Sequence, residues 1–390
     1  MSVLSEKPVM QKQALVITRN FPPLVGGMER LMAQAFKELG REYRCILIGP
    51  QGCEQFVPAP HQATGCSLAH ISVFLMRGLS ATILQARRYD FDFCMAGSGV
   101  TAPLAWAAKL FFGIPAISFI HGLDLIAESP TYQQIFIPAL RQMDLVIANS
   151  NNTARLAKAK GIRPERIEIL HPGVELPAPA PAEDDRLAGE YNLEGKKILL
   201  SVGRLVPRKG LAEFLRFSFP DILAACPETV LVIIGEEPAN ALSRANGARR
   251  EIEQVIREQA LADHVLLLGR APDEKLAAFF QRADLFVFPV REVRGDVEGF
   301  GMVAMEAAAY GVPTVAFATG GVPDAVRDQW SGFLVKTGDY QSFARVTVQY
   351  LTGQATGVNP ERCRAFAAQF SWNHFGRRLL ELCSRGSRQP

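Results

Sequence analysis

Short apolar runs alternate with longer helical stretches along this chain, and that alternation limits the fold more than any other feature of the sequence. The runs of the first half are 14–18, 45–49, 91–96, 116–120, 145–148 and 167–170. The alternation begins again in the second half with 197–202, 230–235, 265–268, 285–289, 314–318 and 333–335. Strands that alternate with helices are typical of a parallel sheet with helices on both faces. We therefore predict the α/β class, with two doubly wound, Rossmann-like domains.

A proline-rich segment separates the two series of runs. Residues 176–185 read LPAPAPAEDD, and proline has no backbone N–H with which to join the interior of a sheet. A chain of 390 residues also exceeds one ordinary hydrophobic core. The predicted divisions are a first domain at 1–176, a linker at 177–185, a second domain at 186–370 and a last helix at 371–390, with Ser371 as its N-cap.

Composition excludes several classes of protein. Hydrophobic residues make up 48% of the chain and charged residues 21%, which fits a globular fold rather than a disordered one. The net charge of +3 is too small to indicate a nucleic-acid partner. The seven cysteines are scattered and never form a C-x-x-C pair, which favours a reducing compartment over a disulfide framework or a zinc site. With no signal-peptide pattern and no apolar run of about 18 residues, we expect a cytoplasmic protein without a membrane span.

The charge is distributed unevenly. Residues 1–176 hold 17 Lys and Arg against 13 Asp and Glu, so that the first half carries +4 and the remainder −1. A basic first half is compatible with a contact to anionic lipid. The predicted helix at 28–41, with Arg30, Lys37 and Arg41, is our candidate for a peripheral contact at the inner face of a membrane. Ordinary scatter of charge and a solvated helix are the simpler alternatives.

Ligands of doubly wound sheets lie beyond the carboxyl ends of the strands, so the residues that follow each strand are candidates for a site. Gly26 and Gly27 come after the first strand and directly before a helix, where backbone amides can approach a phosphate or a sugar. A plain loop-to-helix turn is the alternative, and the pair does not form the G-x-G-x-x-G dinucleotide pattern. His121 follows the strand at 116–120 and precedes a glycine, which favours a functional role over that of a satisfied structural histidine.

A basic turn follows the first strand of the second half. It reads GRLVPRKG and runs from Gly203 to Gly210, just before a predicted helix. Arg204 and Lys209 in this turn are placed to neutralise a diphosphate, because Arg grips two oxygens at once and Lys acts as a point charge. A solvated basic turn is the alternative.

The segment 291–321 places acidic groups in an apolar run. Glu306 is the one charged residue between Met302 and Ala309, and a carboxylate on a mostly buried helix needs a hydrogen-bonding partner. Glu298 stands eight residues earlier and is followed by Gly-Phe-Gly. A helix that begins near Gly301 would turn its free amides and its positive dipole end toward whatever Glu298 faces. The segment therefore predicts an anion site flanked by two carboxylates.

Taken together, these motifs resemble the retaining glycosyltransferases of family 4, the group 1 glycosyltransferases. The resemblance covers nearly the whole chain in the expected order and is carried by Gly26-Gly27, His121-Gly122-x-Asp124, Gly203-Arg204 with Lys209-Gly210, Glu298-Gly-Phe-Gly with Glu306, and Gly320-Gly321. It implies the GT-B fold, in which two Rossmann-like domains face each other across a cleft. It also implies that the last helix crosses back to the first domain.

The resemblance implies a role for each matching residue. Arg204 and Lys209 would bind the diphosphate of a nucleotide-sugar donor, beside Gly203 and with help from the amides of Phe300, Gly301 and Met302. Glu298 would hold hydroxyl groups of the transferred sugar, and Glu306 those of the ribose. From the opposite domain His121 would contact the sugar, with Gly26 and Gly27 near the diphosphate or the acceptor. Asp324 departs from the family, which more often has Glu after the Gly-Gly pair.

The resemblance further implies metal-independent transfer of a hexose-type sugar, with retention, from a UDP- or GDP-linked donor to a glycan, lipid-linked or small-molecule acceptor. The lead-in Arg294-Gly-Asp-Val-Glu298 looks like that of members that glycosylate phosphatidylinositol lipids. Asp90-Phe91-Asp92 starts a predicted strand, away from the ligand-binding end of the sheet, so we expect no metal site and no cofactor. The alternatives are a nucleotide-sugar epimerase or hydrolase of the same architecture and a non-catalytic binding subunit.

Overall fold

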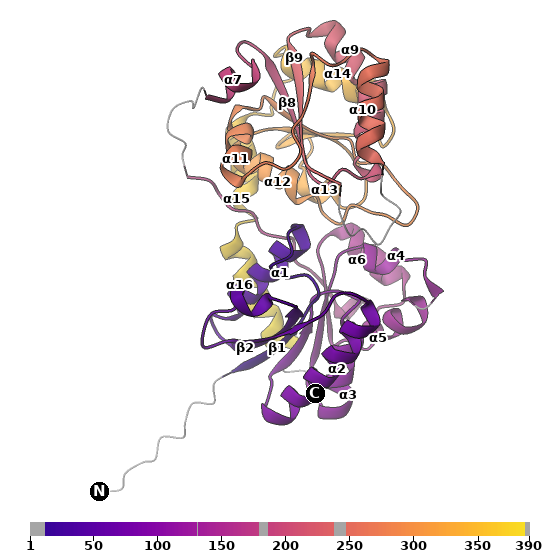
Figure 1. The fold of residues 1–390 in the computed structure, drawn as a ribbon, viewed down its shortest axis with the longest axis vertical. Helices are drawn as coiled ribbons and strands as arrows, with labels where there is room; N and C mark the ends of the chain where they lie inside the picture. Colours follow the sequence, from indigo (N-terminus) through magenta and orange to yellow (C-terminus); the bar gives the residue numbers. More distant parts are fainter. Residues whose placement is uncertain (1–11, 131, 179–185, 238–246, 387–390) are drawn as a thin grey trace, which may run out of the picture. The chain divides into compact units, whose positions relative to one another are not determined.

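The chain forms two compact units in the computed structural model, which describes residues 12–130, 132–178, 186–237 and 247–386 (Figure 1). The first unit comprises Met1–His171 together with Trp372–Pro390, and the second comprises Pro172–Ser371. The division at residue 171 comes before the predicted linker, of which 179–185 lie outside the described residues. The chain returns to the first unit at Trp372, where the last helix begins.

The first unit contains a parallel sheet of seven strands in the order β3-β2-β1-β4-β5-β6-β7. Its strands are β1 Gln13–Ile17, β2 Arg44–Pro50, β3 Gln62–Cys66, β4 Phe93–Ala96, β5 Ala116–Ile120, β6 Leu145–Ala148 and β7 Ile167–Ile169. The apolar runs predicted all of these except β3. That strand reads QATGC, lies at the edge of the sheet and is partly exposed, so it needs no apolar face that the sequence would reveal.

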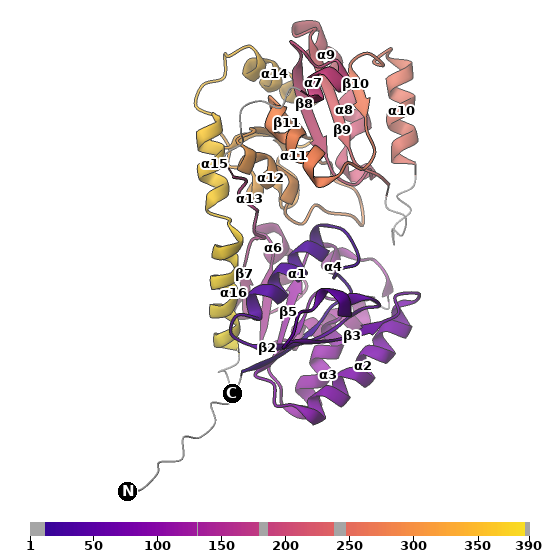
Figure 2. The same ribbon diagram turned by 60° about the vertical axis from the view of Figure 1, so that its left-hand side comes forward.

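Helices cover both faces of this sheet, as the alternation predicted (Figure 2). The helices α2 and α3 lie side by side on one face, and α1 packs against α16 on the other. The α-helices of the first unit are α1 Gly27–Leu39, α2 Ile71–Arg88, α3 Ala102–Phe112, α4 Leu123–Ile126, α5 Ile137–Arg141, α6 Asn151–Ala159 and α16 Trp372–Gly386. Shorter turns are the 3-10 helices η1 Cys53–Phe56 and η3 Pro164–Arg166 and the π-helix η2 Tyr132–Phe136.

The second unit contains a parallel sheet of six strands in the order β10-β9-β8-β11-β12-β13. Its strands are β8 Lys197–Val202, β9 Thr229–Ile234, β10 Val265–Leu267, β11 Leu285–Phe288, β12 Thr314–Phe317 and β13 Gly332–Val335. Every one of them coincides with a predicted apolar run. Because both faces of each central strand are buried, these strands are apolar throughout and easily recognised in the sequence.

Two groups of helices enclose the second sheet (Figure 1). One group, α8, α9, α10 and α14, packs together, and α11, α12 and α15 form the other. The α-helices of the second unit are α7 Arg186–Tyr191, α8 Leu211–Phe217, α9 Phe219–Ala225, α10 Ala248–Glu258, α11 Asp273–Arg282, α12 Met302–Tyr310, α13 Val322–Ala325, α14 Tyr340–Leu351 and α15 Pro360–Ala368, and the 3-10 helix is η4 Pro207–Lys209. Among the described residues of the whole chain, no helix is both long and apolar enough to cross a membrane.

In each unit the chain order reverses at the centre of the sheet. The reversal lies between β1 and β4 in the first unit and between β8 and β11 in the second. Loops that leave the carboxyl ends of such a strand pair diverge to opposite faces of the sheet, which opens the crevice that ligands use in this architecture. The loops after β8 and β11 carry the basic turn and Glu298, so the fold brings these two predicted motifs to one place.

The last helix is fixed to the first unit by close packing on α1. A Cβ atom on Gly376 of α16 would overlap the carboxylate oxygen Oε2 of Glu38 and lie 2.6 Å from its Cδ. The Glu38 side chain is fully buried, where Arg41 pairs with Oε2 at 2.8 Å and Gln34 donates a hydrogen bond to Oε1 at 3.0 Å. Only glycine at 376 therefore allows α16 to approach this buried carboxylate.

We expect the substitution Gly376→Ala to lower the stability of the protein. Overpacking a buried contact costs about 1–3 kcal/mol, which exceeds the roughly 1 kcal/mol that alanine gains over glycine in a helix. The midpoint of thermal unfolding should fall. Gly189→Ala in α7 is the control, because the nearest atom to its added Cβ would be 3.8 Å away. An unchanged or raised midpoint for Gly376→Ala would show that α16 does not depend on this contact.

Candidate active site

The basic turn after β8 is fixed against the segment that follows β11. Gly210 has φ +66°, and a Cβ atom there would overlap the carbonyl oxygen of Pro289, so a side chain at 210 would separate the two segments. The backbone N–H of Arg291 donates a hydrogen bond to the carbonyl of Arg208 at 2.9 Å. This attachment brings η4, with its two adjacent cations, to the loop that contains Glu298.

Glu298 accepts charge-assisted hydrogen bonds from both cations of this turn. Lys209 Nζ lies 2.9 Å from Glu298 Oε2, and Arg208 Nη1 contacts the same oxygen. The other side of the Arg208 guanidinium faces Asp296, with Nε 3.1 Å from Oδ1. Only 7% of the Arg208 side chain, 12% of Lys209 and 13% of Glu298 are exposed, so these charges are largely removed from water. Charges buried in this way must be paired.

The two cations keep Glu298 ionised. Burial by itself would raise the pKa of the Glu298 carboxyl, but the charges of Lys209 and Arg208 outweigh burial and lower that pKa to about 2. Arg204 adds a smaller contribution in the same direction, although its own side chain is exposed at the start of the turn. At neutral pH the site therefore holds a carboxylate whose oxygen Oε2 already accepts from two donors.

Glycines shape the loop that positions Glu298. The N–H of Gly321 donates to the carbonyl of Glu298 at 2.8 Å, and a Cβ on Gly321 would overlap the carbonyl oxygen of Gly299. Gly301 has φ +101° and forms the N-cap of α12, as predicted for the start of this helix. Among the residues that the structure describes, the amides of Gly301 and Met302 donate no hydrogen bond. They remain available to an anion, as helix-terminal amides usually are.

One aromatic ring links the ammonium group to the beginning of α12. Lys209 Nζ lies 4.4 Å from the centre of the Phe288 ring, and a Cβ on Gly301 would lie 3.0 Å from Cε1 of the same ring. Gly203, with φ +141°, is also close to the cation, since a Cβ there would be 3.6 Å from Lys209 Nζ. A buried ammonium, two amides at a helix N-terminus and a bare glycine backbone together make this place in the second unit the candidate anion site.

The remaining predicted residues of the second unit lie on the same elements. Glu306 is half-buried on α12, which begins at this site. The side chain of Phe300 is buried, with its ring 6.2 Å from that of Phe370. The sequence analysis missed Arg208 and Asp296. In the sequence both look like solvated turn residues. The signal that could have identified them is their position, because Arg208 directly precedes Lys209 and Asp296 stands two residues before Glu298.

His121 occupies the corresponding edge of the first unit. Its ring stacks on Phe119, and its backbone N–H donates to Asp124 Oδ2 at 2.9 Å, which explains the spacing of the His-Gly-x-Asp motif. Nε2 lies 2.8 Å from the carbonyl oxygen of Gly97, so Nε2 must carry a proton. Nδ1 is buried and has no hydrogen-bond partner among the described residues. In the neutral ring, Nδ1 can accept a hydrogen bond from a hydroxyl group.

The glycine pair and the capping residues of the first unit have defined positions. Gly26 is the N-cap of α1 and Gly27 its first residue, and the Glu29 carboxylate folds back toward Gly26 while accepting from Asn20 Nδ2 at 2.7 Å. Ser150 caps α6 after β6, because its Oγ accepts from the N–H of Thr153 at 3.1 Å. These observations place the first-unit candidates at the carboxyl edge of their own sheet.

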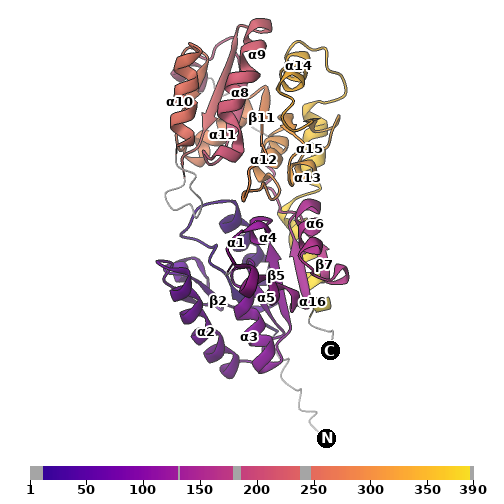
Figure 3. The same cartoon turned by 90° about the vertical axis from the view of Figure 1, so that its right-hand side faces the viewer.

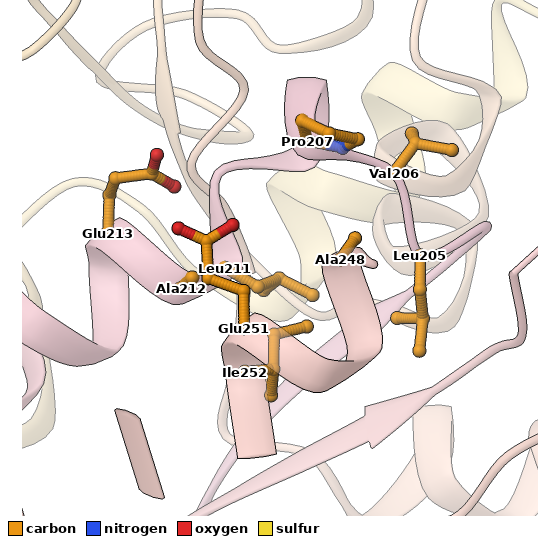
Figure 4. Close-up of a pocket in the computed structure, with 9 residues that line it drawn as sticks. All are labelled: Leu205, Val206, Pro207, Leu211, Ala212, Glu213, Ala248, Glu251 and Ile252. Atoms are coloured by element: carbon orange, nitrogen blue, oxygen red, sulfur yellow. The ribbon is translucent and has the colours of Figure 1, made fainter. Parts of the chain in front are cut away.

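A separate hollow lies between α8 and α10 (Figure 4). Leu205, Val206, Leu211 and Ile252 are among the residues that line it, and the carboxylates of Glu213 and Glu251 border it. Glu213 also pairs with Arg291. None of the predicted site residues is among those that line this hollow, so we do not assign it to the anion site.

Asp90 and Asp92 stand just before β4, at the amino end of the strand. The Asp92 carboxylate accepts from the backbone N–H of Gln13 at 2.7 Å, where it caps the start of β1. Within the described ranges, no three His, Cys, Asp or Glu side chains are arranged to hold a metal ion.

The depressed pKa of Glu298 predicts a pH-dependent stability. A carboxyl whose folded pKa is about 2, below its ordinary 4.5, contributes stability above pH 4.5 and loses it as the pH falls toward 2. The difference corresponds to roughly 3 kcal/mol. We expect Glu298→Gln to destabilise the protein most at neutral pH and progressively less between pH 4.5 and pH 2, because protonated Glu298 resembles glutamine. Urea unfolding of both proteins across this range is the measurement, and a pH-independent difference would contradict the assignment.

Two family models match this chain, one on each half. The model of "Glycosyl transferases group 1" matches residues 184–370, and that of "Glycosyltransferase Family 4" matches residues 25–177. A "GDP-mannose-dependent alpha-(1-6)-phosphatidylinositol monomannoside mannosyltransferase" of Mycolicibacterium smegmatis is 28% identical over 95% of this chain and 98% of its own. A "D-inositol 3-phosphate glycosyltransferase" of Streptosporangium roseum is 27% identical over 92% of this chain and 88% of its own.

Solved structures share the fold. HepE of Anabaena, determined in complex with UDP, superposes with a TM-score of 0.78 at 20% identity and covers 96% of this chain and 100% of its own. Sucrose-phosphate synthase of Thermosynechococcus elongatus has the same score and identity, over 96% of this chain and 99% of its own. The family matches and this likeness confirm the resemblance inferred from the motifs: the chain belongs to the group 1, family 4 glycosyltransferases and has their GT-B fold of two Rossmann-like domains.

Proposed function

We propose that this glycosyltransferase moves a hexose-type sugar from a GDP- or UDP-linked donor to a glycan, lipid-linked or small-molecule acceptor, with retention of configuration and without a metal ion. The names of the similar proteins support GDP-linked mannose as donor and an inositol-containing acceptor as the first pair to test. The lead-in Arg294-Gly-Asp-Val-Glu298 supports the same acceptor class.

The observation that carries this proposal is the buried contact of Lys209 with Glu298. Lys209 is a cation suited to binding phosphate, and Glu298 is a carboxylate suited to binding sugar hydroxyl groups. The two are in direct contact, because Lys209 Nζ donates a hydrogen bond to Glu298 Oε2. Among the described residues, no hydrogen bond reaches Oε1 of Glu298, which leaves that oxygen for a hydroxyl of the transferred sugar. A donor bound here would place its diphosphate at Lys209 and Arg204 and its hexose at Glu298.

Charge stabilisation explains how this site would act without a metal ion. When the bond from C1 of the sugar to the phosphate oxygen breaks, negative charge develops on the diphosphate and positive charge on the ring. Lys209 and the amides of Gly301 and Met302 are donors fixed in advance where that negative charge would develop, and the exposed Arg204 would add a second cation, so together they would favour the transition state. The acceptor hydroxyl would bond to C1 from the same face, and its proton would leave with the diphosphate.

The other predicted residues complete the donor site in this proposal. Glu306 on α12 would hold the ribose hydroxyl groups, and Phe300 would contribute its amide beside Gly301. His121 of the first unit would accept a hydrogen bond from a sugar hydroxyl on Nδ1, a buried atom without a hydrogen-bond partner among the described residues. Gly26 and Gly27 would lie near the diphosphate or the acceptor, at the N-terminus of α1.

The cysteines support a cytoplasmic reaction. All seven are buried, and each is a free thiol. Proteins of oxidising compartments usually use their cysteines in disulfides, whereas cytoplasmic proteins keep them reduced. We therefore propose a cytoplasmic enzyme that meets its acceptor in solution or at the inner face of the membrane.

Loss of a phosphate-binding cation should abolish most of the activity. We expect Lys209→Ala or Arg204→Ala to lower the turnover of sugar transfer at least about a hundredfold, the scale of removing one preorganised donor. The assay follows labelled hexose from GDP-mannose, and in parallel from UDP-glucose, into a phosphatidylinositol mannoside acceptor. Arg257→Ala is the control, because Arg257 is exposed on α10 and belongs to neither of the loops that form the candidate site. Near-normal turnover in both site variants, with folding intact, would refute the phosphate assignment.

The same assay separates the alternatives. A transferase consumes donor only when the acceptor is present, whereas an epimerase or a hydrolase converts the donor alone. A non-catalytic subunit would not convert the donor with or without the acceptor. A true donor would still raise the midpoint of its thermal unfolding by mass action.

A further inference from the structure

Helix α2 presents apolar side chains on the side that faces away from the core. Its buried residues Phe74, Gly78 and Thr82 follow one another at intervals of four and define the inner side. Met76 and Leu84 lie on the opposite side and are 63% and 64% exposed. A surface helix of a globular protein normally carries polar side chains there, so this outer side needs an explanation.

The adjacent end of α3 extends the apolar surface. Leu110 and Phe111, in the last turn of α3, are 64% and 67% exposed. Both helices follow a strand and run back along the same sheet, so their C-terminal ends lie at the same edge, and Figure 3 shows them side by side. Close contact joins them, because a Cβ on Gly78 would be 2.8 Å from Leu104. Together α2 and α3 carry six of the thirteen large apolar side chains that are exposed in the described parts of the chain.

The charged side chains of α2 are all positive, although the exposed Asp90 follows its end and Lys109 of α3 is paired with Asp144. Arg77, Arg87 and Arg88 are exposed on α2, and no ion pair joins any of them to a carboxylate among the described residues. The sequence contains no Asp or Glu at 55–89 or at 93–123, so neither helix carries an acidic residue. Such a surface is complementary to an anionic bilayer. The arginines could contact the phosphate groups at its surface, and the leucine, methionine and phenylalanine side chains could contact the acyl chains beneath.

We propose that this α2–α3 surface docks on a bilayer that contains anionic phospholipid. Charge complementarity selects this occupant, because a second copy of the chain would bring the same arginines face to face and repel. The predicted helix, α1, fits the role less well. Its apolar residues are buried in the first unit except for the half-buried Met28 and Ala33, and its exposed Lys37 has no large exposed apolar neighbour within the helix. The inference concerns where the enzyme binds and does not depend on the proposed donor or acceptor.

Co-sedimentation with vesicles tests the proposal on the full-length protein. We expect binding to vesicles of phosphatidylcholine with phosphatidylglycerol at low salt, weak binding to phosphatidylcholine alone, and release by high salt. The double substitution Leu84→Ser with Phe111→Ser should lower the partition coefficient at least about tenfold, the scale of leaving one large side chain unburied. Arg77→Gln with Arg87→Gln and Arg88→Gln should lower it similarly and remove most of the salt dependence.

Matched controls lie elsewhere on the molecule. Phe217→Ser removes a side chain that is 51% exposed on α8 of the second unit, and Lys37→Gln removes an exposed charge on α1, so neither should change binding. Absence of binding to anionic vesicles at low salt, or equal binding by all variants, would overturn the proposal. So would a dimer in sedimentation velocity that the Leu84 and Phe111 substitutions dissociate. Turnover with a water-soluble acceptor should be unchanged in these variants, which separates this test from that of the proposed function.

Discussion

The pairing of Glu298 with Lys209 and Arg208 is the interaction on which the second unit's site depends. The two cations both contact Oε2 of Glu298, and the side chains of all three residues are about nine-tenths buried. None of these charges would be stable in the interior without the others. The contact requires that the turn after β8 and the loop after β11 approach closely, which Gly210 and Gly321 permit. Removing any of the three leaves uncompensated charge in the interior, so folding and the site are coupled.

The same interaction is the basis for proposing that a nucleotide sugar binds here. Lys209 is held beside free helix amides, where a diphosphate can replace part of its contact with Glu298, and the carboxylate is already ionised. Arg208 differs from Lys209 because its guanidinium is divided between Glu298 and Asp296. We interpret Arg208 as the residue that keeps Glu298 in position while Lys209 engages the donor. In the second unit the candidate residues follow β8 and β11, the strand pair at which the order reverses and where parallel sheets offer a crevice. In the first unit Gly26 and Gly27 follow β1 at the reversal, whereas His121 follows β5, the next strand beyond it.

Most of the fold could be predicted from the sequence, because strands buried on both faces are apolar throughout. The exception was β3, an edge strand whose polar residues carry no such pattern. The start of α12 also followed from a local signal, the Gly-Phe-Gly sequence before an apolar run. The proximity of the basic turn to Glu298 became visible only with the strand order, which places β8 beside β11. The part played by Arg208 and Asp296 could not be predicted, since Arg208 and Glu298 are separated by 90 positions and only the folded chain pairs them. The exposed side of α2 was missed because a helix pattern shows which residues are apolar but not which of them the core covers.

The central claim is that the Lys209–Glu298 contact is the donor site. Its most direct test is a crystal structure with a non-transferable nucleotide diphosphate hexose. The account predicts that the diphosphate contacts Lys209, Arg204 and the amides of Gly301 and Met302, and that a sugar hydroxyl donates to Glu298. A donor bound away from this contact, with Lys209 still paired only to Glu298, would contradict it.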